Sequence, residues 1–234
     1  MKLNGVEFFD KIVTPKGKEN VRTLEKMVPK YLVIHNTGNS APGADDAAHA
    51  KYLQNVENAD KTYVSWHLTV DCNSVTKHLP FEEQGYHAGD GKGKGNTQGI
   101  GIEIAENKDY PKAEDNALNV ICFLMKAYSI TVDRVLPHRY FATNKKLCPH
   151  KILHSQATWQ KDWSVFQKRI EERYKLLYKP TSGTGGVKEV VYQIEKGDTL
   201  GGISKKYGVD ILTLAKKNNL SYPYKVYVGK KITI

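Results

Sequence analysis

A short stretch near residue 180 constrains the fold more than any other feature of this sequence. Residues 179–188, KPTSGTGGVK, combine proline, glycine, serine and threonine with a single larger apolar residue. Such a stretch cannot contribute to a buried core and is typical of a flexible linker. The sequence therefore predicts two units of unequal size, a larger one over residues 1–178 and a small one over residues 189–234.

The charge balance restricts the kinds of partner that such a chain can have. Lys and Arg number 35 against 25 Asp and Glu, which gives a net charge of +10. This excess favours polyanionic partners such as nucleic acid, an anionic membrane surface or an acidic cell wall. The positive residues are dispersed, however, and form no recognisable nucleic-acid-binding motif. No apolar stretch is long enough to span a bilayer. We therefore expect neither a nucleic-acid partner nor a membrane span.

The N-terminus and the cysteines bear on where the protein acts. The segment MKLNGVEFFDKIV carries Glu7 and Asp10 within its apolar part and lacks the apolar core of a secretory signal. We therefore expect synthesis in the cytoplasm without a signal peptide, with release by another route if the protein acts outside the cell. Three scattered cysteines argue against a disulfide scaffold and leave room for a metal thiolate: Cys72, Cys122 and Cys148.

Strand-like and helical patterns are mixed along the larger unit. Apolar, β-rich runs predict strands over residues 31–35, 63–71, 74–80 and 99–106. Helical spacing of apolar residues predicts helices over residues 45–54, 116–128 and 163–179. This mixture indicates an α/β or α+β architecture in which helices cover a sheet.

Three residues next to predicted strands could form a metal site. His35 lies where an apolar run meets turn-forming residues, His138 follows another short β-rich run, and Cys148 comes ten residues later. Zinc accepts imidazole nitrogen and thiolate sulfur, and a catalytic zinc site needs three protein ligands plus an open position. The spacing is not that of a zinc finger, and a lone histidine in such a place is more commonly a packed one. The residues alone leave both interpretations open.

Four separated blocks occur in the order found in a known enzyme family. VIHNT, WHLTVD, HAGDGKGKGNTQGIGIEIAE and HRYFATNKKLCPH together resemble the zinc-dependent N-acetylmuramoyl-L-alanine amidases. That family includes phage endolysins and is related to the peptidoglycan-recognition proteins. The similarity covers about residues 25–175. It implies a central mixed β-sheet flanked by helices, with Zn²⁺ held by His35, His138 and Cys148.

The resemblance also implies two catalytic residues. Glu103 occupies the family's general-base position, on the opposite face of its strand from Ile102 and Ile104. Lys146 matches a lysine of the phage amidases that could stabilise an oxyanion, although other family members carry a different residue there. The alternatives are an ordinary outward-facing glutamate and a solvated lysine.

Predicted substrate contacts rest on weaker signals. The glycine-rich residues 87–96 lack the strand–turn–helix context of a phosphate loop. By resemblance they line the substrate groove, with Asp90 and Asn96 as polar contacts. Trp66 could be either a core residue or a platform for sugar or peptide, and we expect the adjacent His67 to be structural.

The small unit resembles a single LysM module. The matching pieces are YQIEKGDTL, ISKKYGVDILTLAKKNNL and YVGKKITI, and they predict a β-α-α-β unit. The resemblance implies binding to N-acetylglucosamine-containing glycans. Nine lysines against four acidic residues in residues 188–234 would draw this unit toward an anionic wall. The alternative is a charged solubility tail.

These signals together predict a zinc-dependent N-acetylmuramoyl-L-alanine amidase of the endolysin type. Its partner would be bacterial peptidoglycan, with the muropeptide in the catalytic groove and the glycan on the LysM module. Three alternatives remain: a bacterial autolysin, a peptidoglycan-recognition protein without catalysis, and a zinc peptidase that cuts elsewhere in the stem peptide.

Overall fold

The computed structural model describes residues 1–59, 62–178, 191–207, 209, 211–220 and 225–234. Contacts between Cα atoms divide the chain into two units, Lys2–Tyr178 and Lys179–Ile234, with Met1 assigned to the second. The predicted linker, residues 179–188, lies outside the described residues.

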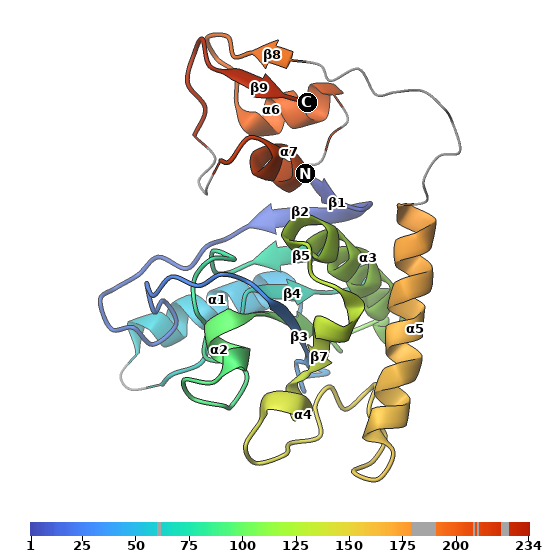
Figure 1. The fold of residues 1–234 in the computed structure, drawn as a ribbon. Coiled ribbons are helices and arrows are strands. Elements are labelled where there is room, and N and C mark those ends of the chain that lie inside the picture. The colour runs from blue at the N-terminus through green and yellow to red at the C-terminus, as the bar shows by residue number, and fades with distance from the viewer. Residues whose placement is uncertain (60–61, 179–190, 208, 210, 221–224) are drawn as a thin grey trace. The chain divides into compact units, whose positions relative to one another are not determined.

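Among the described residues of the larger unit, seven strands form one sheet (Figure 1). Their spatial order is β1 (Lys2–Leu3), β2 (Val6–Asp10), β5 (Ser74–Lys77), β4 (Leu68–Val70), β6 (Gly99–Ile104), β3 (Tyr31–Asn36) and β7 (Val135–Pro137). The pairs β1–β2 and β4–β5 are antiparallel, and the remaining pairs are parallel. The central strands β3 and β6 are buried on both faces, which explains why both read as nearly continuous apolar runs.

Three long helices cover the sheet: α1 (Asp46–Asn58), α3 (Tyr110–Tyr128) and α5 (Trp159–Leu177). Helix α1 packs against β4 and β5, α3 packs against β1, β2, β4 and β6, and α5 packs against α3. Aspartates cap the first two helices: the Asp45 and Asp109 side chains accept hydrogen bonds from the Ala48 and Lys112 backbone N–H groups. Short helices α2 (Lys94–Gln98), η1 (Val132–Arg134) and α4 (His138–Phe141) complete the unit. The predicted mixed sheet flanked by helices is confirmed.

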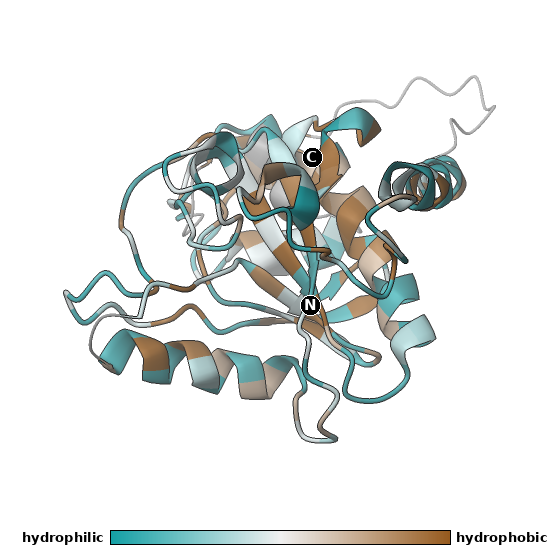
Figure 2. Cartoon of the chain, turned by 90° about the horizontal axis from the view of Figure 1, so that it is seen from below, coloured by the Kyte–Doolittle hydropathy of each residue, from teal (hydrophilic) through white to brown (hydrophobic). Residues whose placement is uncertain are grey.

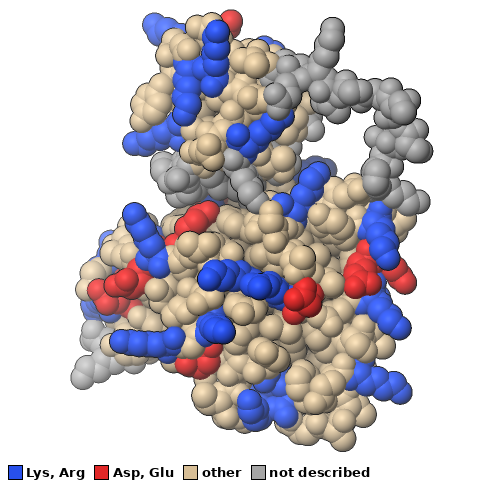
Figure 3. All heavy atoms as spheres, viewed as in Figure 1, with Lys and Arg blue, Asp and Glu red and all other residues tan. Residues whose placement is uncertain are grey.

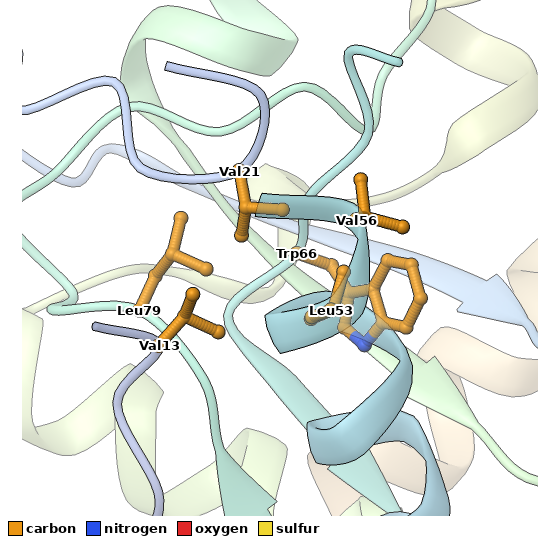
Figure 4. Close-up of a cluster of buried hydrophobic side chains, with 6 residues drawn as sticks. All are labelled: Val13, Val21, Leu53, Val56, Trp66 and Leu79. Carbon is orange, nitrogen blue, oxygen red and sulfur yellow. The ribbon is translucent and has the colours of Figure 1, made fainter. Parts of the chain in front are cut away.

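A cluster of apolar side chains fixes α1 beside the sheet (Figure 4). Leu53 and Val56 from α1 meet Trp66 and three residues from the flanking segments, Val13, Val21 and Leu79. Figure 2 shows that apolar residues are concentrated on the strands. The outer helices carry polar residues on one side and apolar residues on the other. No helix among the described residues is long and apolar enough to cross a membrane.

The small unit has its own sheet and core. Strands β8 (Val191–Gln193) and β9 (Lys231–Thr233) pair antiparallel, and helices α6 (Leu200–Tyr207) and α7 (Ile211–Lys217) lie between them in sequence. Its core consists of apolar residues from all four elements and their flanks: Ile194, Leu200, Ile203, Leu214, Ala215 and Ile232. The predicted β-α-α-β unit is confirmed.

Candidate active site

Backbone pairing brings His35 and Glu103 together. Strands β3 and β6 are parallel neighbours, and their register pairs these two residues directly. Paired residues on adjacent parallel strands project from the same face of a sheet. His35 Nδ1 lies 3.9 Å from Glu103 Oε1, with the His35 and Glu103 side chains only 2% and 14% exposed. A residue at the end of one strand and a residue 68 positions later thus form one buried pair.

His138 and Cys148 complete a cluster around His35. Strand β7 pairs with β3 on the side opposite β6, and His138 follows it directly at the start of α4. The chain then returns so that the Arg139 N–H donates to the Cys148 carbonyl at 2.9 Å. One ligand atom from each of His35, His138 and Cys148 lies within 4.8 Å of the other two. Within the described residues, no other group of three or more His, Cys, Asp or Glu side chains meets this condition.

The donor atoms of this cluster suit a zinc ion. Two imidazole nitrogens and one thiol sulfur form a ligand set that zinc prefers, and three protein ligands leave a position open. Burial lowers the pKa of His35 well below its ordinary value and that of His138 to about 4, so both rings are neutral and have a free lone pair at neutral pH. Burial raises the pKa of the Cys148 thiol to about 12, so binding a cation there would release a proton.

Glu103 has the surroundings of a proton-transferring carboxyl group. Burial raises its pKa to about 8, and the nearby Lys146 charge acts in the opposite direction. Its Oε2 atom is buried and has no hydrogen-bond partner among the described residues, and the same holds for Thr37 Oγ1. Buried polar atoms are rarely left unpaired without a functional reason. Both residues line a cavity of about 510 Å³, which also contacts Tyr52 and Trp66.

Lys146 lies close enough to act on the whole cluster electrostatically. Its side chain is exposed, and its charge lowers the pKa of His35, Glu103 and His138. The Cys148 N–H donates to the Lys146 carbonyl at 3.0 Å, which ties the lysine to the cysteine loop. Lys146 is therefore a cation at the rim of the cluster.

Trp66 is a core residue that also lies at the wall of the cavity. It is 7% exposed within the cluster of Figure 4, and its Nε1 donates to Thr69 Oγ1 at 2.8 Å. It also stacks on Tyr52, with ring centroids 6.1 Å apart, at the wall of the cavity beside Glu103. A contact between Trp66 and a substrate stays a prediction.

Asp90 and Asn96 use their polar atoms inside their own loop. The Asp90 carboxylate accepts the Gly95 and Asn96 N–H groups at 2.7 and 3.2 Å. Asn96 is buried, and its Oδ1 accepts the N–H groups of His87 and Ala88 at 2.9 and 2.7 Å. The structure therefore gives both residues a part in shaping the loop, and their predicted contact with substrate stays a prediction.

Two residues beside the cluster were not singled out from the sequence. His87 is buried, and its Nδ1 lies 3.2 Å from His35 Nε2. Glu106 links two loops, since it accepts the Gly38 N–H at 2.8 Å and lies 3.1 Å from His150 Nε2. The glycine at 101 offered a signal for His87, because glycine inside a strand marks close approach by another group, and a Cβ atom there would lie 2.8 Å from the His87 ring.

The small unit has a separate cavity. It measures about 380 Å³ and is lined by Thr199 and Leu200 at the start of α6, Ile211 of α7, and Lys225 and Tyr227 before β9. Apart from Ile211, these residues lie in the segments that follow β8 and precede β9.

Comparisons with known proteins find matches for both units. A family model described as N-acetylmuramoyl-L-alanine amidase matches residues 25–151, and a LysM domain model matches residues 192–234. The chain is 39% identical over 222 residues to the N-acetylmuramoyl-L-alanine amidase XlyA of Bacillus subtilis (strain 168), covering 94% of this chain and 65% of XlyA. It is 46% identical over 130 residues to CwlH of the same organism, covering 54% of this chain and 50% of CwlH.

A solved structure is also similar to this chain. The structure of a mutant endolysin from Bacillus subtilis is similar with a TM-score of 0.61 and 43% identity, covering 70% of this chain and 99% of that chain. The chain spans between half and two thirds of the length of the two curated relatives above.

Proposed function

Because the chain belongs to the N-acetylmuramoyl-L-alanine amidase family, we propose that it hydrolyses the amide bond between N-acetylmuramic acid and the L-alanine of the peptidoglycan stem peptide. One observation carries this proposal: a buried His–His–Cys cluster lies next to a buried glutamate that strand register pairs with one of the histidines. Amide hydrolysis needs an activated water and a group that moves its proton, and this arrangement offers both.

His35, His138 and Cys148 would hold the zinc ion. A bound zinc ion supplies Lewis acidity, which polarises a carbonyl oxygen and makes a water molecule acidic near neutral pH. The protein contributes orientation: His35 is fixed by the central strand β3, and the Cys148 backbone is fixed by hydrogen bonds to Arg139 and Lys146.

Glu103 would act as the general base and then as the general acid. Its free Oε2 atom faces no competing donor among the described residues, so the carboxylate can take a proton from water and pass it to the leaving amine. A cation held by His35, His138 and Cys148 would favour the ionised Glu103 carboxylate and so offset the burial that raises its pKa.

Lys146 would stabilise negative charge that develops on the carbonyl oxygen. A fixed cation beside a poorly hydrated site lowers the energy of an oxyanion. The support is electrostatic: its charge acts on both histidines of the cluster and on Glu103. Its exposure suits a residue that tunes the rate rather than one on which the fold depends.

The cavity beside Glu103 would take the muropeptide. Tyr52 and Trp66 offer apolar ring surfaces there, and the loop over residues 37–44 supplies backbone and small side chains. Asp90 and Asn96 would contribute by shaping the neighbouring loop. Asp90 would also contact the substrate directly.

The same family evidence supports a proposed division into domains. Residues 1–178 would form the catalytic domain, residues 179–188 a linker, and residues 189–234 a LysM domain that binds glycan containing N-acetylglucosamine. On the face in Figure 3, the charged side chains of the small unit are mainly basic, which suits an anionic wall. Tethering raises the concentration of the catalytic domain at an insoluble substrate. An endolysin released at lysis is the setting we propose.

A digest of purified peptidoglycan tests the proposed reaction and its metal together. Mass spectrometry is expected to find free stem peptides that begin with L-alanine, to lose them after chelation and to recover them when zinc is added. Cuts elsewhere in the stem peptide would refute the proposed bond and retain a zinc hydrolase. Binding without any cut, at full zinc occupancy, would support a non-catalytic recognition protein.

Removal of residues 188–234 separates wall binding from catalysis. We expect the truncated chain to bind insoluble peptidoglycan more weakly and to degrade it more slowly, because it lacks the tether. Its rate on a small soluble muropeptide should stay within about 2-fold of the full chain, since the described catalytic cluster lies within residues 35–148. Sedimentation with peptidoglycan and soluble-substrate kinetics measure the two effects. A collapse of the soluble rate would place part of the active site in the small unit.

A further inference from the structure

His87 contacts the candidate zinc ligand His35 and does not belong to the ligand set itself. His87 Nε2 lies 3.2 Å from the Gly99 carbonyl oxygen, and its Nδ1 lies 3.2 Å from His35 Nε2. A carbonyl oxygen can only accept, so His87 Nε2 must carry a proton, and Nδ1 of the neutral ring is then an acceptor. His35 must therefore donate from Nε2. This assignment leaves a free lone pair on His35 Nδ1.

The free nitrogen of His35 is the one that lies toward the catalytic carboxyl group, 3.9 Å from Glu103 Oε1. A histidine binds a metal only through an unprotonated ring nitrogen. The opposite tautomer would place a proton on His35 Nδ1, and two unprotonated nitrogens would then face each other across the contact with His87. The hydrogen bond from His35 to His87 thus reserves Nδ1 for a ligand.

Two glycines and a neighbouring histidine hold the His87 ring in place. A Cβ atom at Gly101 would lie 2.8 Å from His87 Cγ, and a Cβ atom at Gly85 would lie 3.0 Å from His87 Cδ2. The His67 ring packs edge-on against His87 at 5.6 Å, and its own Nδ1 accepts the Gly101 N–H at 2.9 Å. The space for His87 therefore exists only because positions 85 and 101 lack side chains.

The backbone at His87 is held as well. The His87 and Ala88 N–H groups both donate to the buried Asn96 Oδ1 at 2.9 and 2.7 Å. The same segment passes the second histidine of the cluster, because a Cβ atom at Gly89 would lie 3.3 Å from His138 Nε2. One asparagine thus anchors the segment that carries His87.

We propose that His87 orients one of the two histidine ligands: it fixes the tautomer and ring plane of His35. His87 is then a positioning residue that acts through His35. Hydrogen-bond partners of this kind commonly change metal affinity by about 10- to 100-fold when they are removed. This inference rests on the proposed zinc hydrolase, because it concerns how His35 receives the metal.

The first test uses the unaltered full chain loaded with zinc. Nitrogen-15 NMR of the histidine side chains distinguishes a protonated from an unprotonated ring nitrogen. We expect protons on Nε2 of both His35 and His87. A proton on His87 Nδ1, or a deprotonated His35 Nε2, would overturn the proposal.

The second test compares two substitutions at the same position. His87→Phe keeps a ring between the two glycines and removes the acceptor, so we expect zinc affinity to fall by about 10- to 100-fold in competition with a chromogenic chelator. His87→Asn retains an acceptor close to the position of Nδ1, and its zinc affinity should fall by less. Equal zinc affinity for folded His87→Phe and the unaltered chain would overturn the proposal.

A matched control removes another buried imidazole. His78 is fully buried and bonds to Thr69, away from the His35–His138–Cys148 set, so His78→Phe should retain zinc affinity even if it lowers stability. If His87→Phe does not fold, the NMR measurement on the unaltered chain still decides. An unaltered chain that binds no zinc would refute the proposed function instead, which keeps the two failures distinct.

Discussion

Glu103→Gln is expected to lower the rate of amide hydrolysis by about 100- to 10,000-fold and to leave zinc content unchanged. Glutamine has nearly the same size and fills the same place on β6, so packing in the β3–β6 pair should survive. The glutamine amide cannot take a proton from water at neutral pH. Its NH₂ group would also replace one of the two carboxylate oxygens, including the Oε2 atom that has no partner among the described residues. Kinetics on a soluble muropeptide, with zinc measured by mass spectrometry, check both parts.

Glu106→Gln is the control for charge. Glu106 lies three residues along the chain and raises the pKa of Glu103 through its own charge, yet its carboxylate bonds to the Gly38 N–H and lies beside His150. Its loss should change the rate by less than about 10-fold, since it removes a nearby charge and no proton carrier. A Glu103→Gln protein with the full rate would eliminate Glu103 as the base. A Glu103→Gln protein without zinc would instead make Glu103 part of the metal site.

The sequence predicted the type of fold because its central strands are strongly apolar. The runs at residues 31–35 and 99–106 became β3 and β6 with small changes at their ends. The run at 63–71 was predicted too long: only Leu68–Val70 forms β4, while Trp66 packs into the α1 cluster. Apolar, β-branched residues fit either a strand or a core loop, and pairing partners decide between them.

Strands β1 and β2 were not predicted at all. They are short and lie at the edge of the sheet, and Phe9 of β2 is exposed, so the apolar signal is weak. The parallel pairing of β2 with β5 joins residues about 67 positions apart. Such pairing is fixed by the rest of the sheet and has no local signature.

The candidate site, like the fold, could be predicted only in part from the sequence. Side-chain chemistry and family resemblance pointed to His35, Glu103, His138 and Cys148, and the structure places these four residues around one point. His87 was missed because eight histidines look alike in sequence, and its distinction is which ring nitrogen carries the proton. That property depends on the Gly99 carbonyl 12 residues away. It appears only when the chain is folded.

Cys148→Ser is expected to abolish stoichiometric zinc binding and, with it, amide hydrolysis. Zinc binds a thiolate far better than a serine hydroxyl, which would have to lose its proton at a much higher cost. The Cys148 thiol needs a bound cation to lose its proton, because burial raises its pKa to about 12. Metal analysis after dialysis, followed by kinetics at saturating zinc, measures the two consequences.

Cys122→Ser and Cys148→Asp separate the metal role of Cys148 from the general effect of removing a cysteine. Cys122 is equally buried, and its Sγ donates to the Ile170 carbonyl between α3 and α5, so its substitution can lower stability without a change in zinc content. Cys148→Asp offers zinc an anionic oxygen and should retain more metal than Cys148→Ser, because carboxylates also bind zinc. If Cys148→Ser keeps a full complement of zinc while Cys122→Ser behaves identically, Cys148 is a packed cysteine. His35 and His138 would then need a different third partner, and the Glu103 carboxylate, 3.9 Å from His35 Nδ1, could serve as one.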